Sequence, residues 1–455
     1  MFDVFEKKSS YPEIKIQQYW NSVKKGTKFL STDNKEVIIQ YQGLWNFEKG
    51  PDFLGAEFYL CGIKIIGDIE IHNNLSDWIS HGHSNDKTYS NVKLHVILKN
   101  DVKTQNANFF LLPDIPVVLL NKDNIESNSK NKGYSKSIKG NCCDYYKLLP
   151  LEEIVSVFSN AGRLRFEKKV YAFVEAILKN SKEKAFLQNI IKACGYKKNS
   201  EQFGRIFERV AEHDFDGSNI YKIIALFFGE SGLLPDTSSL ELSPQMKEYV
   251  SHLWEFWWQH RKESADCTKP VFHSVRPYNN PCRRLVAASI LYKRFTNEIK
   301  DFLIPNLISS DKCSDFLNMV YPHLLCSDEM WSQHIDFFRK SEKKVLLLGK
   351  ARALDIVVNV ILPFAGACGK LEGNVLVYER SLDFWMNLPA LQPNIYQKIG
   401  QNRWFSDLEM VKHLFSKSAN QQGAQFICQN MCEYLRMNCE KCIIYNMLIA
   451  RLPLK

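Results

Sequence analysis

The hydrophobic period changes once along this chain, and that change constrains the fold more than any other feature. From Glu36 to about Asn100, apolar and polar residues alternate in stretches such as EVIIQYQG and NVKLHVILKN, which are rich in β-branched residues. This alternation predicts the strands of a sheet. From about residue 150 onward, apolar residues recur every three or four positions, as in LEEIVSVFSNAGRLRF, which predicts helices. We therefore expect an α+β protein, with an N-terminal mixed sheet followed by a mostly α-helical domain.

A polar stretch separates the two patterns. Residues 121–140, NKDNIESNSKNKGYSKSIKG, are rich in Ser, Asn and Lys and almost free of core residues. Such composition is typical of a mobile loop or linker. We therefore expect a β-rich domain over residues 1–120, a polar loop or linker over 121–144, and a helical domain over 145–455 with a cysteine-rich end. A chain of 455 residues with 45% hydrophobic content has room for such cores.

The composition restricts the cellular location and the classes of partner. The first residues, MFDVFEKKSS, lack the basic and then apolar order of a secretory signal. No apolar run approaches the roughly 20 residues of a membrane span. Thirteen scattered cysteines, an odd number, are typical of reduced thiols. We expect a cytoplasmic protein without a membrane partner. The formal net charge of +9 fits nucleic acid as a partner, although many soluble proteins share such a charge. The oligomeric state is left open.

One strand of the expected sheet carries polar groups on a single face. In GDIEIH, alternation places Asp68, Glu70 and His72 on one face and two isoleucines on the other. The plain explanation is the solvated face of a half-buried sheet. A functional site is the alternative, because the Pro-Asp pair that begins the preceding strand brings Asp52 next to Glu70.

Two carboxylates and an imidazole together can bind Mg²⁺ or Mn²⁺, and such an ion would activate water for attack on a phosphodiester. In this hypothesis Asp52 and Glu70 hold the ion and His72 assists. Further polar side chains follow closely in the sequence and complete the set of site candidates: Asp68, Asp77, His81, His83 and His95.

The Pro-Asp pair, the spacer and the Glu-x-His triplet resemble the PD-(D/E)xK nuclease core. In that fold an Asp at the start of one strand and a Glu on the next ligate the metal. The resemblance implies Asp52 and Glu70 as ligands, His72 in the place of the usual Lys, and Glu13 of the first helix as a further acid. It implies a restriction-endonuclease-like fold and metal-dependent hydrolysis of phosphodiester bonds in nucleic acid.

The histidine at the basic position keeps a second class of function open. Histidine is neutral for much of the time at pH 7, so it stabilises negative charge less than Lys does. The alternative is therefore a degenerate nuclease fold without catalysis, which binds a partner or acts as a scaffold.

The histidines offer a third hypothesis, a zinc hydrolase. His81 and His83, two positions apart, can project together towards Zn²⁺, with His72 or His95 completing the site. The plain alternative is a polar loop whose histidines cap backbone groups, with Trp78 as its core anchor.

The end of the chain contains a separate cluster with the spacing C-x3-C-x6-C-x2-C, formed by Cys428, Cys432, Cys439 and Cys442. Four converging thiolates suit Zn²⁺ or an iron–sulfur cluster. The C-x6-C-x2-C part resembles the iron–sulfur loop of helix-hairpin-helix DNA glycosylases. The fourth cysteine that those proteins carry downstream is absent here, so Cys428 would serve from upstream. A structural Zn²⁺ is favoured over a cluster, and unliganded thiols facing a helical core are the alternative.

An arginine-rich stretch, RPYNNPCRRL, contains Arg276, Arg283 and Arg284. Guanidinium forks suit phosphate, so these residues are phosphate-binding candidates. The alternative is a turn between helices followed by a helix N-terminus.

A second resemblance covers nearly the whole chain. GPDF, GDIEIH, SDWISHGH, YSNVKLHV, RPYNNPCRRL, GKARALDIVVNVILPF and the cysteine-rich tail together resemble the bacterial DUF2851 family. That family has no known function. The resemblance therefore implies that the polar strand and the cysteine tail belong to one protein design, and it implies no activity.

Overall fold

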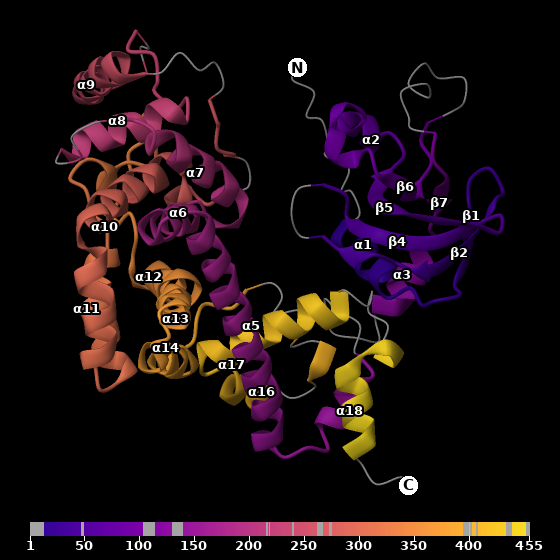
Figure 1. Cartoon of the computed structure of the whole chain (residues 1–455). Coiled ribbons are helices and arrows are strands. Elements are labelled where there is room, and N and C mark those ends of the chain that lie inside the picture. The colour runs from indigo at the N-terminus through magenta and orange to yellow at the C-terminus, as the bar shows by residue number, and fades with distance from the viewer. Residues whose placement is uncertain are drawn as a thin grey trace. The chain divides into compact units, whose positions relative to one another are not determined.

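The computed structural model describes residues 13–46, 50–102, 114–129, 140–214, 217, 219–238, 241–261, 267–272, 275–394, 400, 403–405, 408–433 and 439–451. The chain forms two compact units (Figure 1). Unit 1 comprises Met1–Ile154, Asn394–Val411 and Ala424–Lys455, and unit 2 comprises Val155–Pro393 and Lys412–Gly423. The end of the chain thus clusters with the N-terminal sheet region, which differs from the expected run of three continuous segments.

The predicted α+β class is confirmed, with the sheet in unit 1. Its strands are β1 (Lys28–Leu30), β2 (Glu36–Tyr41), β3 (Leu44–Trp45), β4 (Phe53–Leu60), β5 (Ile63–Asn74), β6 (Val92–Lys99) and β7 (Val117–Leu119). They lie in the order β1-β2-β4-β5-β6-β7, and β3 pairs with β4. Pairs up to β4–β5 are antiparallel, while β5–β6 and β6–β7 are parallel. The sheet is therefore mixed, as expected.

Most of the remaining described residues lie in helices. Before residue 150 they are α1 (Glu13–Asn21), α2 (Asp77–Ser80), η1 (His83–Asn85), η2 (Lys87–Tyr89), α3 (Lys122–Ser129) and α4 (Cys142–Tyr146). From residue 151 they are α5 (Leu151–Lys179), α6 (Lys182–Cys194), α7 (Tyr196–Val210), α8 (Ile220–Glu230), α9 (Pro244–His260), η4 (Pro277–Asn279), α10 (Pro281–Ser309), α11 (Cys313–Leu324), η5 (Trp331–Gln333), α12 (Lys350–Ile356), η6 (Val357–Ile361), α13 (Leu362–Leu371), α14 (Val375–Asn387), α16 (Leu408–Leu414), α17 (Ser418–Ile427), η7 (Cys428–Glu433), η8 (Cys439–Lys441) and α18 (Ile443–Arg451).

The two faces of β5 meet different partners. Ile69 and Ile71 are fully buried in a core that also contains Ile16 and Trp20 of α1 and Ile125 of α3. Burying such a side chain stabilises the fold by roughly 1.5–3 kcal/mol. Because successive side chains of a strand point to opposite faces, the polar residues of β5 face away from this core.

The parallel pairing of β5 and β6 explains what covers the polar face. Parallel neighbours need a crossover connection, since the chain must return to the same end of the sheet. Here the connection carries α2, η1 and η2, and it brings the histidine-containing segment over β5 and β6. The register places His95 of β6 beside Glu70 of β5.

The expected polar loop over residues 121–144 contains helical structure. Residues 122–129 form α3, because Ile125 is an apolar anchor within the polar run and packs into the sheet core. Near its other end the segment enters α4, whose Cys142, Cys143 and Tyr146 are buried. Residues 130–139 lie outside the described part of the chain. Composition alone therefore underestimated how much of this segment is helical and packed against the core.

Unit 2 is helical and is organised around α10, which contacts α6, α8, α11 and α14. The helix begins where Asn280 caps the backbone N–H of Cys282 and Pro281 occupies the first turn, a position that needs no N–H. The helical run Lys350–Leu371 is long and apolar enough to span a membrane by length and composition, although 78% of its most apolar window is buried inside the protein. Core helices of that kind pass the same test.

Candidate metal centre

The polar face of β5 is buried, so the expectation of a solvated face is wrong. Glu70 is 5% exposed, His72 1% and His95 of β6 0%. Asp68 is buried as well, and its Oδ1 accepts a 2.8 Å hydrogen bond from the backbone N–H of Gly55. Charged and imidazole groups are rarely buried without partners, because burial removes them from water. This face therefore needs an explanation in terms of binding.

The crossover segment delivers two further histidines to the same face. His81 follows α2, and Gly82 adopts a left-handed conformation with φ 73° before His83 begins η1. A residue with a side chain is strained in this conformation, so glycine suits the tight turn between the histidines. Trp78 is buried beneath the segment and donates a 3.1 Å hydrogen bond to Ser84. Trp78 is thus the core anchor that the sequence suggested, and it holds a histidine cluster in place.

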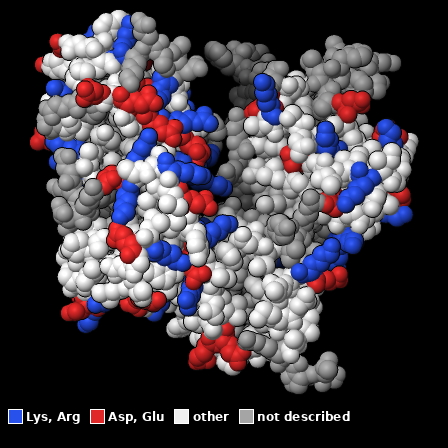
Figure 2. All heavy atoms as spheres, in the orientation of Figure 1, with Lys and Arg blue, Asp and Glu red and all other residues white. Residues whose placement is uncertain are grey.

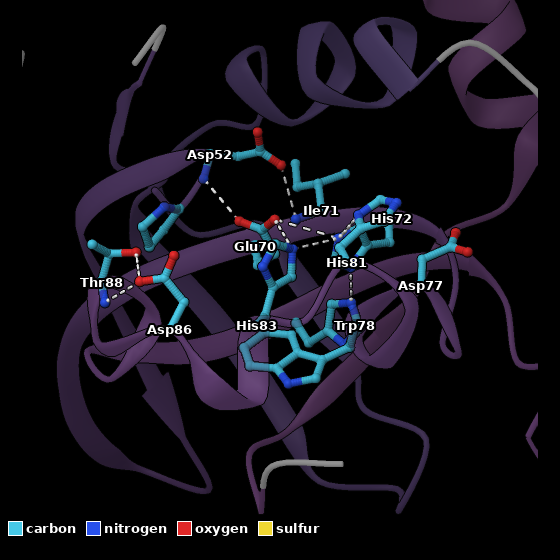
Figure 3. Close-up of polar contacts among 12 residues, drawn as sticks. Asp52, Glu70, Ile71, His72, Asp77, Trp78, His81, His83, Asp86 and Thr88 are labelled. Carbon is cyan, nitrogen blue, oxygen red and sulfur yellow. Dashed lines mark hydrogen bonds and ion pairs between the residues drawn. The ribbon is translucent and has the colours of Figure 1, made fainter. Parts of the chain in front are cut away.

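Three imidazole nitrogens, from His72, His81 and His83, lie close together, and a carboxylate oxygen of Glu70 lies beside two of them (Figure 3). Nε2 of His72 lies 3.2 Å from Nδ1 of His81 and 3.2 Å from Nε2 of His83. Oε1 of Glu70 lies 3.2 Å from Nε2 of His83 and 3.4 Å from Nε2 of His72. Among the described residues, the three histidines form a set whose ligand atoms all lie within 4.8 Å of one another.

These separations fit a bound cation better than a set of hydrogen bonds. A neutral imidazole carries one N–H, so Nε2 of His72 can donate to one of its three neighbours at most. Around a tetrahedral Zn²⁺ with ligand bonds of about 2.0–2.1 Å, neighbouring ligand atoms lie about 3.4 Å apart. The two separations from His72 to the other histidines lie near this value, and Glu70 stands beside His72 and His83, outside the group of three. The donor set, with imidazole nitrogens in the majority, suits Zn²⁺ better than Mg²⁺, which prefers oxygen ligands.

The protonation states also suit a metal. Burial, with the neighbouring His95, His83 and His81, lowers the pKa of His72 to about 2, and burial also lowers the pKa of His83. Both imidazoles are therefore neutral, which is the form that binds metals. Nδ1 of His72 lies 2.8 Å from Nε2 of His95, and burial lowers the pKa of His95 to about 3. His95 is thus placed to orient the His72 ring by accepting its Nδ1–H.

A tyrosine that the sequence analysis did not single out packs against His83, the second buried histidine of the cluster. The ring of Tyr89 in η2 stacks on His83 with centroids 3.8 Å apart. Asp86 caps η2 by accepting from the backbone N–H of Thr88 at 3.0 Å (Figure 3). The only sequence signal for this contact is an aromatic residue a short distance after the histidines. The stacking of Tyr89 on His83 depends on how η2 packs against η1, which the sequence pattern does not show.

Asp52 lies beside Glu70 but directs its carboxylate elsewhere. Its Oδ1 accepts from Gln17 of α1 at 2.7 Å, and its Oδ2 accepts from the backbone N–H of Ile71 at 3.0 Å. In return, the backbone N–H of Asp52 donates to Oε2 of Glu70 at 3.1 Å. The pair thus ties the start of β4 to β5, and Asp52 positions Glu70. Burial raises the pKa of both carboxyl groups above their ordinary range. Neighbouring acids raise these pKa values further, whereas the hydrogen bonds that the two carboxylates accept lower them.

The remaining acidic candidates are placed as follows. Glu13 is half-buried on α1, and burial raises its pKa, while the nearby His81 and His83 lower it. Glu13 is therefore close enough to the cluster to interact with the charges of two of its histidines. Asp77 accepts from the backbone N–H of Asn74 at 2.8 Å and stabilises the start of α2. It has no contact with the four converging donor atoms among the interactions described for it.

The arginines occupy a different place from the one expected of phosphate ligands. Arg283 and Arg284 are buried in unit 2, 0% and 6% exposed, and they donate to backbone carbonyl groups. They are structural donors at the start of α10, which agrees with the alternative of a turn followed by a helix N-terminus. Arg276 is exposed at the start of η4.

The cysteine cluster differs from its expected membership. A cavity in unit 1 is lined by Cys432, Cys439 and Cys442 together with Cys142 of α4. Cys428 is fully buried at the start of η7 and is not among the residues that line this cavity. In the sequence, the feature that draws attention to Cys142 is the adjacent Cys143. Local spacing could not link this pair to the distant tail.

The buried carboxyl groups predict a dependence of stability on pH in the metal-free protein. Burial holds the pKa of Glu70 above its ordinary value of 4.5, so the folded state binds more protons than the unfolded state above that pH. Its contribution is therefore fully present below pH 4.5 and is lost as the pH rises through the folded pKa. We expect the free energy of unfolding to fall over this range in the presence of a chelator.

The measurement is urea unfolding at a series of pH values, with wild type compared with Glu70→Gln. The glutamine has nearly the same shape and does not ionise, so its slope is expected to be smaller. Equal slopes for the two proteins would contradict the buried carboxyl as the source.

Comparisons with known proteins place most of the chain in a single family. A family model with the description "Protein of unknown function (DUF2851)" matches residues 13–393. Neither a curated protein nor a solved structure matches the chain. The match includes the entire histidine and carboxylate cluster and ends before the cysteines of the tail.

Proposed function

The chain belongs to the DUF2851 family, a family of unknown function, and from the geometry of its site we propose that it is a metal-dependent hydrolase. The observation that carries this proposal is the convergence of His72, His81 and His83, whose ligand atoms all lie within 4.8 Å of one another, with Glu70 beside two of them. The zinc hypothesis is thus better supported than the Mg²⁺ or Mn²⁺ hypothesis, which needed Asp52 and Glu70 as the main ligands.

The arrangement resembles an open catalytic site more than a closed structural one. His72 and His83 are buried, whereas His81 is exposed and leaves the site accessible to solvent. Catalytic zinc sites hold the ion with three protein ligands and leave one position for water or substrate. An ion bound here would lower the pKa of a water molecule and polarise the bond to be cleaved.

The chain's own residues then have distinct tasks. His72, His81 and His83 bind the ion. Glu70 has one oxygen beside the histidine nitrogens and the other held by the backbone N–H of Asp52, so it is oriented to accept a proton from an attacking water. Asp52 acts through Glu70 and is a positioning residue.

The substrate that we propose is a phosphodiester of nucleic acid. Three positions support it: Asp52 precedes one strand, Glu70 lies on the neighbouring strand, and Glu13 lies close by on the first helix, as in the nuclease core that the sequence resembles. The net charge of +9 is compatible with this substrate. On the face drawn in Figure 2, Lys and Arg lie among Asp and Glu, so the charge there forms no continuous basic stripe.

The experiment is a cleavage assay on labelled single- and double-stranded DNA and RNA, after chelation and the return of Zn²⁺, Mn²⁺ or Mg²⁺. We expect cleavage by the wild type with Zn²⁺ or Mn²⁺. His83→Ala and Glu70→Gln should lower the rate at least about 100-fold, because they remove a ligand and the proton acceptor.

Asp68→Asn is the matched control, since it removes a carboxylate from the same face of β5 outside the cluster. It should retain activity. Metal binding without cleavage of any nucleic acid would contradict the proposed substrate. A folded wild type that binds no metal would contradict the hydrolase itself and favour the non-catalytic scaffold.

A further inference from the structure

A second cluster of chemically reactive side chains lies in unit 1, apart from the histidines in the sequence. Four cysteines line one cavity: Cys142 of α4, Cys432 of η7, Cys439 of η8, and Cys442, which precedes α18. Cysteines from two distant parts of the chain thus line the same cavity.

The cavity is closed by large apolar and aromatic side chains. Its lining includes Tyr146, Trp404, Ile427 and Ile444. Tyr146 and Trp404 are 1% exposed. Four thiols gathered in a site of this kind are weak hydrogen-bonding partners for one another, so their convergence points to a ligand with an affinity for sulfur.

A buried arginine supplies the second observation. Arg403 is 4% exposed, and its Nη2 lies 3.3 Å from Sγ of Cys439. Burying a guanidinium costs several kcal/mol unless negative charge lies close to it. Metal-bound thiolates provide that charge, and N–H groups directed at cysteine sulfur stabilise such centres.

The backbone of Gly140 lies close to both Arg403 and Cys142. The N–H of Gly140 donates to the carbonyl oxygen of Arg403 at 2.9 Å. A Cβ at Gly140 would lie 3.3 Å from Sγ of Cys142 and 3.4 Å from Nε of Arg403. The chain before α4 and the segment around Arg403 are thus joined directly beside the sulfur atoms.

The spread of the sulfur atoms distinguishes between the two metal centres that four cysteines can hold. Around a single tetrahedral Zn²⁺ with Zn–S bonds of about 2.3 Å, neighbouring sulfurs lie about 3.8 Å apart. Among the described residues, the cysteines do not form a group of three or more with all ligand atoms within 4.8 Å, although the histidines do. A cluster of several irons holds its thiolates at its outer corners, farther apart than a single ion does.

We propose that Cys142, Cys432, Cys439 and Cys442 hold an iron–sulfur cluster, with Arg403 as its charge partner. The preference for Zn²⁺ that the sequence suggested is thereby reversed, and Cys142 takes the place of Cys428. As each sulfur binds iron, its thiol releases one proton, while iron and inorganic sulfide come from outside the chain. The cluster links α4 to the C-terminal segment within unit 1.

The test begins with the full-length wild type, produced with added iron and purified without oxygen. We expect at least about two irons and two sulfides per chain, and a broad visible absorption that dithionite bleaches. Mössbauer spectra of the same wild-type sample identify the cluster without any substitution. Zinc in the cysteine site, or wild-type protein without iron and sulfide after anaerobic purification, would overturn the proposal.

Variants then assign the ligands. Cys142→Ala should lose most of the iron and sulfide, whereas Cys143→Ala and Cys428→Ala, which alter buried cysteines outside the cavity lining, should keep them. Circular dichroism checks that each variant is folded. Loss of the cluster from Cys428→Ala with retention in Cys142→Ala would refute the assignment. None of these readouts depends on the hydrolase activity.

Discussion

His81→Ala is expected to lower the affinity for Zn²⁺ by at least about 100-fold, because it removes one of three imidazole ligands. His81 is the most informative of the three, since its side chain is exposed and its loss leaves the core intact. The same substitution should abolish the metal-dependent activity proposed above. Isothermal titration of chelator-treated protein with Zn²⁺ gives the affinity and the stoichiometry.

His252→Ala is the matched control, because His252 is an exposed histidine on a helix of unit 2. It should leave the affinity of the histidine site unchanged. The cysteine cavity is the second metal site that we propose, so the titration is best repeated in Cys142→Ala. Equal affinities for wild type and His81→Ala in that background would exclude His81 as a ligand.

Arg283→Ala is expected to reduce the free energy of unfolding of unit 2 by about 3 kcal/mol or more. The Arg283 side chain is fully buried at the start of α10 and burial lowers its pKa to about 10, so it stays charged at neutral pH. It donates to the backbone carbonyl groups of Trp331, His334, Val345 and Leu346. Truncation removes the donor from all four carbonyl groups, of which those of Trp331 and His334 are buried, and it opens a cavity.

Urea unfolding followed by tryptophan fluorescence measures the change. Arg276→Ala, at an exposed arginine a few residues earlier, should alter the stability by no more than about 0.5 kcal/mol. If Arg283→Ala instead leaves the stability unchanged and weakens nucleic-acid binding, then the original assignment of phosphate binding is the correct one.

The histidine site could be predicted in part from the sequence. Alternation along GDIEIH was sufficient to place Glu70 and His72 on one face, and the structure has them there. The zinc hypothesis already contained the three histidines that converge, together with His95. Local pattern offered no basis for choosing this hypothesis over the carboxylate site, since the choice depends on where Asp52 directs its oxygens.

Three other expectations failed for reasons that a local pattern cannot supply. Arg283 and Arg284 of RPYNNPCRRL are charged, but contacts with a segment some fifty residues later bury them. The tail cysteines are close together in the sequence, but the fourth cysteine that lines their cavity comes from α4. The segment over residues 121–144 is polar, but Ile125 within it is enough to attach α3 to the sheet core.

The sequence by itself determined the class of fold, the change from strands to helices and the polar face of β5, because these follow from the backbone period of neighbouring residues. Only the tertiary structure decided that this face is buried and that the crossover brings His81 and His83 onto it. It also decided that Cys142 meets the tail. Such contacts depend on how segments that are distant in the sequence pack together. They stabilise the protein only after the entropy cost of closing the chain between those segments has been met.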